Sequence, residues 1–309
     1  MPCPLCKTDK TYTLRVGIRD EPERRVYACH SCRLQFLLPD TLDIREYYRN
    51  GYRKTHGPLL SVETTAEERF KIYRPFAAIT AADIREQLPK GASILEIGCS
   101  SGYLLDALQK DYDVYGNEWN PEDAACVREV GELPCEEGDI SEVYPGKRFT
   151  AIVATAVIEH QPDPVGWLSK VKERLIGGGW LYLETPNAND ALVAVFDFPE
   201  FRDFWYRAPH LTYWEMENMA AALSSVGFQA RISIRQKYGL LNHLSWMMDK
   251  KPMSSFVEAA GRWRPVASEH PMAPVLNRWF DRLDREYRVQ METLRIADTI
   301  TVWARRREI

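Results

Sequence analysis

Four of the seven cysteines form two Cys-x2-Cys pairs near the start of the chain, a spacing typical of a metal site. Two such pairs, joined by residues 7–28, can place four thiolates tetrahedrally around one Zn²⁺ ion at about 2.3 Å. Soft sulfur ligands select zinc over magnesium or calcium. Four protein ligands leave no position for a catalytic water, so the predicted zinc is structural. Its predicted ligands are Cys3, Cys6, Cys29 and Cys32.

The other cysteines and the net charge bear on the compartment and the partners. Cys99, Cys126 and Cys135 are scattered, which is typical of buried thiols in a reducing compartment; a disulfide among the paired cysteines is the competing interpretation. No apolar segment follows the first residue and no long apolar run occurs, so we expect a cytoplasmic protein without a membrane span. The formal net charge of -4 argues against nucleic acid as a partner.

The segment LEIGCSSG at residues 95–102 is the second feature that could do chemistry, because it has the pattern of a strand running into a glycine turn. A nicotinamide-binding turn requires G-x-G-x-x-G. Counted from Gly98, the corresponding residues are Gly98, Ser100 and Tyr103. Two of the three positions fail, which excludes the nicotinamide pattern and leaves the turn to be interpreted from the elements around it.

Strands and helices alternate from residue 92, and they must position this turn. Apolar strand patterns cover residues 93–98, 113–118, 149–158 and 180–186, and helical patterns cover residues 103–110, 121–131 and 163–175. This alternation predicts an α/β fold with a parallel sheet and helices on both faces, a doubly wound, Rossmann-like core. The strand patterns at residues 228–236 and 298–306 fit an antiparallel edge added to that sheet.

The remaining segments predict five parts of the chain. Residues 1–40 form a zinc-binding ribbon, with a strand near residue 11 and a charged turn over residues 18–25. Residues 41–90 form a helical connector, in which Pro75 kinks or divides a helix. Residues 91–236 form the core, residues 237–297 a C-terminal helical insertion that serves as an acceptor lid, and residues 298–309 the final core strand.

The pattern Glu96-x-Gly98-x-x-x-Gly102 resembles motif I of the class I S-adenosylmethionine-dependent methyltransferases, with Ser100 in place of the middle glycine. The resemblance covers residues 91–236 and the last strand. It implies that S-adenosyl-L-methionine is the cofactor, with Glu118 at its ribose and Asp139 at its adenine. The cofactor-binding residues implied in this way are Glu96, Gly98, Cys99, Ser100, Gly102, Glu118, Trp119, Asp139 and Ile140.

Three histidines are candidate catalytic bases, since an alcohol acceptor benefits from a base and a neutral amine does not. His160 belongs to a Glu-His pair similar to one common after the fourth strand in the family. His210 lies in an aromatic stretch that resembles an element after the fifth strand, and core packing is its competing interpretation. His243 follows in the helical insertion. The residues alone do not assign the base.

A zinc ribbon, a tyrosine-rich connector and a class I core together resemble a group of bacterial methyltransferases that act on sugars, surface-glycan substituents or secondary metabolites. The resemblance favours O-methylation of a small-molecule or glycan-linked acceptor. We expect its pocket among residues 46–56, 204–214 and 238–248. The alternative is an RNA or protein methyltransferase whose ribbon docks the substrate. A binding module without catalysis is the third hypothesis, and the presence of Gly98, Gly102 and Glu118 argues against it.

Overall fold

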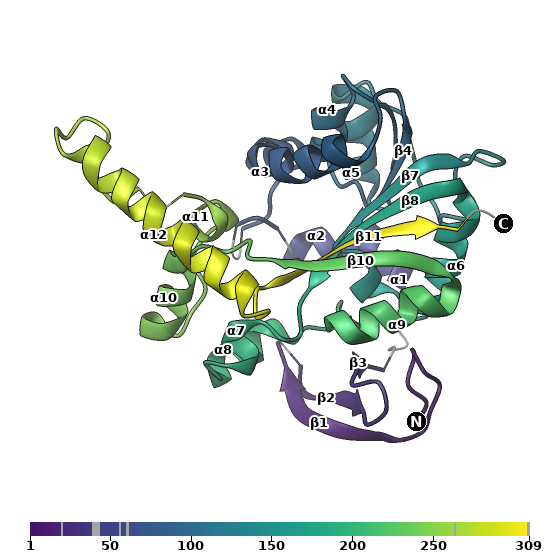
Figure 1. Ribbon diagram of the computed structural model, residues 1–309, viewed down its shortest axis with the longest axis horizontal. Helices are drawn as coiled ribbons and strands as arrows, with labels where there is room; N and C mark the ends of the chain where they lie inside the picture. Colours follow the sequence, from purple (N-terminus) through teal and green to yellow (C-terminus); the bar gives the residue numbers. More distant parts are fainter. Residues whose placement is uncertain (20, 39–43, 56, 60–61, 263, 308–309) are drawn as a thin grey trace. The chain divides into compact units, whose positions relative to one another are not determined.

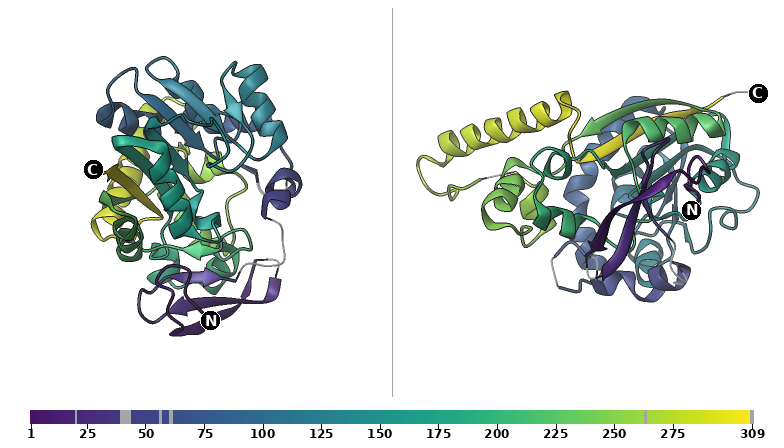
Figure 2. Two further views of the ribbon diagram at one scale, coloured as in Figure 1. Left: turned by 90° about the vertical axis from the view of Figure 1, so that its right-hand side faces the viewer. Right: turned by 90° about the horizontal axis from the view of Figure 1, so that it is seen from below.

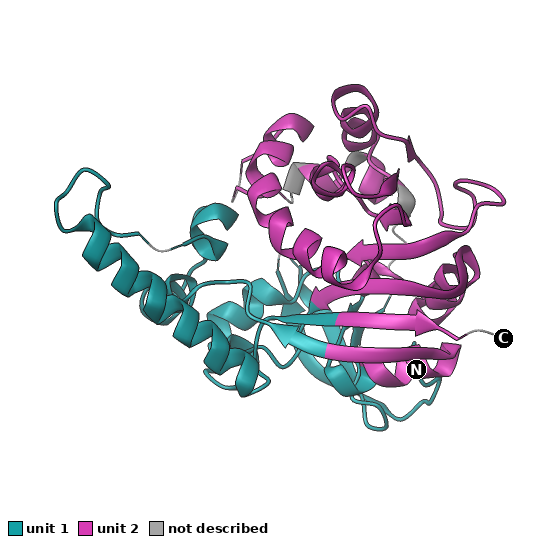
Figure 3. Cartoon of the chain, turned by 45° about the horizontal axis from the view of Figure 1, so that its top comes forward, with its two compact units in different colours: residues 1–38, 186–218, 233–301 teal, residues 39–185, 219–232, 302–309 magenta. Residues whose placement is uncertain are grey.

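The computed structural model describes residues 1–19, 21–38, 44–55, 57–59, 62–262 and 264–307. Its contacts divide the chain into two compact units (Figure 3). Unit 1 comprises residues 1–38, 186–218 and 233–301, and unit 2 comprises residues 39–185, 219–232 and 302–309. The predicted boundary between ribbon and connector, at residues 40 and 41, lies outside the described residues. The five-part division of the chain into domains stays a prediction.

The ribbon of unit 1 is a small antiparallel sheet. Strands β1 (Thr11–Ile18), β2 (Glu21–Cys29), β3 (Gln35–Leu37) and β9 (Thr212–Tyr213) lie in that order. Val26, Phe36 and Leu37 are buried, while charged residues of β2 face outward. The predicted turn over residues 18–25 is wrong for most of its length, because Glu21 begins β2 and pairs with Arg24 at 3.1 Å on the strand.

Unit 1 also contains short helices and the long helix of the C-terminal region. Two apolar clusters hold them, one around Phe201 and Trp246 and the other around Met291. The helices are α7 (Ala191–Ala194), α8 (Pro199–Trp205), α10 (Leu240–Asp249), α11 (Phe256–Ala260) and α12 (Ala273–Thr293).

Unit 2 begins with the connector helices α1 (Ile44–Asn50), α2 (Tyr52–Thr55) and α3 (Ala66–Gln87). Thr65 and Glu68 form a capping box at the start of α3, which satisfies free backbone N–H groups there. Pro75 lies inside this one continuous helix, so of the two predicted outcomes, a kink or a division into two helices, the division does not occur. Ala81 and Ile84 pack into the apolar core of unit 2, and this packing holds the helix together across the missing hydrogen bond.

A seven-stranded sheet has the order β10-β11-β8-β7-β4-β5-β6 (Figure 1). The pairs β4–β5, β4–β7, β5–β6 and β7–β8 are parallel, as the alternating pattern predicts. Strands β10 and β11 extend the sheet beyond β8, and the division into units falls within them. The strands are β4 (Ser93–Ile97), β5 (Asp113–Asn117), β6 (Cys135–Glu136), β7 (Phe149–Thr155), β8 (Leu175–Pro186), β10 (Phe228–Arg235) and β11 (Thr299–Arg306).

The strand order determines where a ligand can approach this sheet. Along the chain, β5 and β6 are added to the sheet on one side of β4, and β7 and β8 are then added on the other side. The order in which strands are added therefore reverses at β4. Ligands of open α/β sheets bind at the carboxyl ends of strands beside such a reversal. The helical segments between the described strands are α4 (Tyr103–Leu108), α5 (Pro121–Ala125) with a π-turn at Cys126–Val130, a 3₁₀ turn at Ile158–His160, α6 (Pro164–Arg174) and α9 (Met216–Val226).

Candidate functional site

The loop after β4 has a backbone that requires glycine at two positions. Gly98 and Gly102 have φ of +68° and +82°. A Cβ on Gly98 would lie 3.0 Å from Val157 Cγ2, and one on Gly102 would lie 2.9 Å from Val127 Cγ2. Ser100 between them also has a positive φ, +49°, a conformation that glycine adopts without steric penalty. The loop therefore keeps the backbone course of a glycine-rich turn although its middle residue is serine.

Glu118 follows β5 directly and joins the two neighbouring loops. Its Oε2 accepts a hydrogen bond from the backbone N–H of Ser100 at 2.8 Å, and its Oε1 accepts one from the N–H of Asn120 at 2.9 Å. Burial raises the pKa of Glu118, and the nearby Arg53 guanidinium opposes that rise. The structure thus brings the predicted ribose-binding acid to the predicted cofactor loop.

Two buried polar atoms of this region lack a hydrogen-bond partner among the described residues. They are Oε2 of Glu96, which is fully buried in β4, and Oγ of Ser101. Burial, and then the charge of Glu118, raise the pKa of Glu96 well above its ordinary value. Buried polar atoms in folded proteins are normally hydrogen-bonded. These two orphaned atoms beside the loop therefore fit a site whose polar ligand completes the hydrogen bonding.

Asp139 is engaged by its own turn. Its Oδ1 accepts hydrogen bonds from the N–H of Ser141 at 3.0 Å, from the Ser141 hydroxyl at 2.5 Å and from Lys170 at 3.0 Å. Burial works to raise the pKa of Asp139, but these hydrogen bonds outweigh it and lower the pKa overall. Ile140 beside it is buried. The hydrogen bonds of Oδ1 thus serve the local turn and α6, and a contact of Asp139 with adenine stays a prediction.

An aromatic cluster surrounds His160 in unit 2. The ring centroid of Tyr48 lies 5.5 Å from that of His160 and 6.0 Å from that of Trp119, and Tyr52 lies 6.3 Å from His160. The indole N–H of Trp119 donates to the carbonyl of Gly138 at 2.5 Å. His160 is buried, with Nε2 3.9 Å from Glu159 Oε1. Helices α1 and α2 therefore bring tyrosines to the loop after β7.

Arg53 of α2 bridges the connector to the predicted cofactor loop. Its guanidinium donates to Ser100 Oγ at 2.7 Å and to Asp123 Oδ2 at 2.7 Å. Asp123 also accepts from the buried Arg69 of α3 at 2.9 Å. The sequence interpretation missed Arg53 and Asp123, since contacts across this distance in the chain leave no local pattern. The available signals were an arginine within a tyrosine-rich connector and the Asn-Pro start of α5.

The other two candidate bases belong to unit 1. Nε2 of His210 accepts a hydrogen bond from Nε of Arg207 at 2.9 Å, and its ring lies 5.9 Å from that of Tyr213. His243 in α10 is buried, with Nδ1 bonded to the Tyr287 hydroxyl and Nε2 3.2 Å from the amide of Gln236. Burial lowers the pKa of His243 to about 4. His243 is thus a neutral histidine within a polar network. A catalytic role for His160, His210 or His243 stays a prediction.

The aromatic residues expected in an acceptor pocket at residues 204–214 are largely packed in unit 1. Trp214 and Tyr213 are buried, and Trp205 lies 4.9 Å from Tyr213 between ring centroids. Tyr206 is also buried and donates to Gln35 of the ribbon at 2.5 Å. Packing between the ribbon and α8 thus accounts for these side chains.

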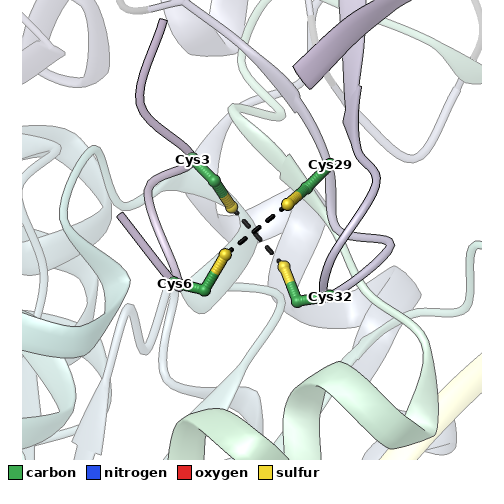
Figure 4. Close-up of side chains that lie close together, drawn as sticks. All are labelled: Cys3, Cys6, Cys29 and Cys32. Carbon is green, nitrogen blue, oxygen red and sulfur yellow. Dashed lines mark hydrogen bonds between the residues drawn. The ribbon is translucent and has the colours of Figure 1, made fainter. Parts of the chain in front are cut away.

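The four paired cysteines converge, with sulfur atoms directed toward one another (Figure 4). All four sulfurs lie within 4.8 Å of one another, and two pairs are separated by 3.5 Å. Tetrahedral zinc thiolates require sulfurs about 3.8 Å apart. Four convergent sulfurs at these separations fit a zinc ion.

The two halves of this cluster have the same backbone turn. Lys7 and Arg33 follow the second cysteine of each pair and have φ of +58° and +62°. Their backbone N–H groups donate to the carbonyls of Cys3 and Cys29 at 2.9 Å. The N–H of Ser31 also approaches Cys29 Sγ at 3.4 Å. Two equivalent turns thus direct four thiols toward one point, an arrangement that fits a single metal ion.

A family model described as a methyltransferase domain matches residues 66–231, more than half of the chain. The chain belongs to this methyltransferase domain family. The predicted Rossmann-like methyltransferase fold and the resemblance to class I S-adenosylmethionine-dependent methyltransferases are thereby confirmed. The match spans the elements from α3 to β10 that carry the glycine loop and Glu118, so these belong to the methyltransferase domain.

Curated relatives of the domain have different substrates in their names. The ubiquinone biosynthesis O-methyltransferase of Cereibacter sphaeroides is 28% identical over 130 residues, covering 38% of this chain and 51% of that protein. The tRNA U34 carboxymethyltransferase of Alteromonas mediterranea is 23% identical over 241 residues, covering 68% of this chain and 65% of that protein. The chain spans about half the length of the ubiquinone-pathway relatives it matches.

Among solved structures, a S-adenosylmethionine-dependent methyltransferase from Archaeoglobus fulgidus aligns with a TM-score of 0.47 at 17% identity, covering 76% of this chain and 98% of that one. Within the part of the chain that the structure describes, no helix is both long and apolar enough to cross a bilayer.

Proposed function

We propose that the protein is a S-adenosylmethionine-dependent methyltransferase that methylates an oxygen of a small-molecule or glycan-linked acceptor. The observation that carries the cofactor assignment is the buried Glu118 carboxylate bonded to the loop between Gly98 and Gly102, at the strand reversal of a methyltransferase-family sheet. S-adenosylmethionine, when bound, supplies an electrophilic methyl group on a sulfonium.

Residues of the chain bind the cofactor, exclude water and accept the proton of the acceptor. Glu118 offers two carboxylate oxygens to the ribose hydroxyls, and the orphaned Glu96 and Ser101 oxygens offer hydrogen bonds beside the loop. Tyr48 and Tyr52 cover the loop after β7 with aromatic surface and exclude water from the transfer. His160 makes edge-to-face contacts with both rings and, in this proposal, takes the acceptor's proton, a role that an alcohol nucleophile requires.

The similarity to ubiquinone biosynthesis O-methyltransferases supports oxygen as the accepting atom, because they match across part of the methyltransferase domain. Calorimetry with S-adenosylhomocysteine tests the cofactor assignment. We expect binding by the intact chain and a loss of at least tenfold in affinity for Glu118→Gln, which removes the charge and keeps the shape. Glu122→Gln, an exposed acid of the following helix, is the matched control. Absence of binding, or equal affinity in Glu118→Gln, would sink the proposal.

A transfer to RNA is the second candidate, favoured by the match to tRNA U34 carboxymethyltransferases over 68% of this chain. In this case the ribbon docks the nucleic acid. Salt-dependent retention of tRNA on filters, lost in Lys10→Glu and Arg25→Glu variants of the ribbon, would support it, since phosphate contacts weaken with salt. Retention that is absent at low salt would leave the small-molecule acceptor as the proposal.

We also propose that Cys3, Cys6, Cys29 and Cys32 hold one structural Zn²⁺. Metal analysis of the purified chain should give about one zinc per molecule, because four thiolates close a single tetrahedral site. Folded protein without zinc would refute this assignment, and it would leave the cofactor proposal untouched because the two sites share no residue.

A further inference from the structure

The inner face of α12 is built into unit 1. Figures 1 and 2 show α12 as the long yellow-green helix, and α10 packs against it. Asp284 accepts from the N–H of Leu240 at 2.7 Å and pairs with Arg288 at 2.7 Å. Tyr287 bonds to His243, and Met291 is buried. Residues spaced by three and four define this inner face.

The outer face of α12 carries a second row with the same spacing, and the residues of this row are exposed in the part of the chain that the structure describes. With 3.6 residues per turn, this row is centred about 180° from Asp284. Three of its members are large apolar side chains left open: Val275 is 58% exposed, Trp279 45% and Val289 55%. The complete row, which we call the outer row, is Val275, Trp279, Arg282, Glu286, Val289 and Thr293, and all six are exposed.

The outer row of one chain is complementary to the same row of a second, antiparallel copy. When the row is laid antiparallel on a copy of itself and centred at Asp284, Trp279 faces Val289, Arg282 faces Glu286 and Val275 faces Thr293. The two-fold symmetry repeats each contact. A parallel arrangement would set Arg282 against Arg282 and Glu286 against Glu286. Within one chain Arg282 and Glu286 lie 3.8 Å apart, so the antiparallel pair forms a network of four alternating charges.

We propose that the protein is a two-fold dimer in which α12 pairs antiparallel with α12 of a second copy through the outer row. Alternating three and four residue spacing is the geometry of helices that cross at about 20°. Exposed apolar rows rimmed by charge mark interaction surfaces, and Trp is the residue most enriched at binding hot spots. The self-complementary order of charges selects a second copy over an unrelated partner.

Sedimentation velocity of the full chain over a range of concentrations tests the dimer. We expect a dimer whose dissociation constant rises roughly 100-fold or more in Trp279→Asp, because each dimer loses two buried indoles. Val195→Asp is the matched control, since Val195 is 54% exposed in unit 1 and lies outside α12. Circular dichroism confirms folding of both variants. A chain that is monomeric at every concentration, or a dimer indifferent to Trp279→Asp, overturns the proposal.

A charge exchange tests the antiparallel register. Arg282→Glu and Glu286→Arg should each weaken the dimer about tenfold, because two attractive pairs become repulsive. The double variant R282E/E286R should restore the dissociation constant to within about threefold of the original, since the exchanged charges again alternate. Single variants without effect indicate a parallel or unrelated interface, and a double variant as weak as the singles indicates another register. Each result rejects the antiparallel pairing.

Discussion

The backbone of Ser100 has a φ of +49°, which an L-residue reaches only at a steric cost. Its hydroxyl accepts a hydrogen bond from Arg53 at 2.7 Å, and its N–H donates to Glu118. Compared with glycine, serine at this position is strained by the positive φ, but its hydroxyl forms a hydrogen bond to Arg53 of α2. A residue that departs from the family motif is here the point at which the connector attaches to the loop.

Two substitutions at Ser100 separate these contributions. Ser100→Ala and Ser100→Gly both lose the bond from Arg53, but only glycine relieves the positive φ. We expect Ser100→Gly to be more stable than Ser100→Ala by about 1 kcal/mol. Urea unfolding of both variants measures the difference. Equal stabilities would mean that the backbone of this loop is not strained.

His243 should make the stability of the protein depend on pH. Burial and the charge of Arg288 lower its pKa from 6.5 to about 4. Between these values the unfolded chain binds a proton that the folded chain does not, so stability falls as pH falls from about 6.5 to about 4, by about 3 kcal/mol. His243→Gln cannot titrate and should lack this loss. Unfolding curves at pH 7 and pH 4.5 compare the two chains, and parallel changes in both would exclude His243 as the cause.

Among the elements, α2, α3 and α5 meet at one carboxylate. Asp123 accepts from Arg53 and from Arg69, and its own N–H donates to the Asn120 cap at 3.0 Å. Both the carboxylate and Arg69 are fully buried. The Asp123 carboxylate therefore anchors α2, α3 and α5 beside the predicted cofactor loop. This arrangement positions the tyrosines of α1 and α2.

Removing that charge should be costly. Asp123→Asn removes the buried charge shared by Arg53 and Arg69 and leaves Arg69 only its ion pair with Glu122 at 3.3 Å, and we expect a loss of about 3 kcal/mol. The neighbouring Glu122→Gln should cost under about 1 kcal/mol, because that side chain is largely exposed. Chemical denaturation ranks the two variants. A small effect of Asp123→Asn would show that the helices are held by apolar packing alone.

Helices and strands could be predicted where the pattern of apolar residues within one segment is sufficient to define them. The alternation of strands and helices predicts the parallel sheet because each element buries one face of its own residues. The turn over residues 18–25 was wrong, since charged residues fit the solvent face of an antiparallel strand equally well. The helix is not divided at Pro75, which was one of its two predicted outcomes, because Ala81 and Ile84 pack against strands that lie far along the chain.

For the whole molecule, we predict that the proposed zinc stabilises the ribbon of unit 1. Its sheet buries few apolar side chains, and domains of this size commonly need a metal or disulfides to fold. Cys6→Ser should reduce the zinc content from about one per chain to near zero and lower the melting temperature. Cys126→Ser, a buried thiol of unit 2, should keep the zinc. Equal zinc content in both variants would place the metal elsewhere.

Local patterns were sufficient to predict the cysteine pairs, the glycine loop with Glu118 and the class of fold, because each of these depends on spacing along a short segment or on the repeated order of elements. Only the folded chain shows that Arg53 reaches Ser100, that Asp139 is held by Ser141 and Lys170, and that His243 lies in a buried network. Those contacts join residues from separate elements, and their geometry is set only when the elements pack.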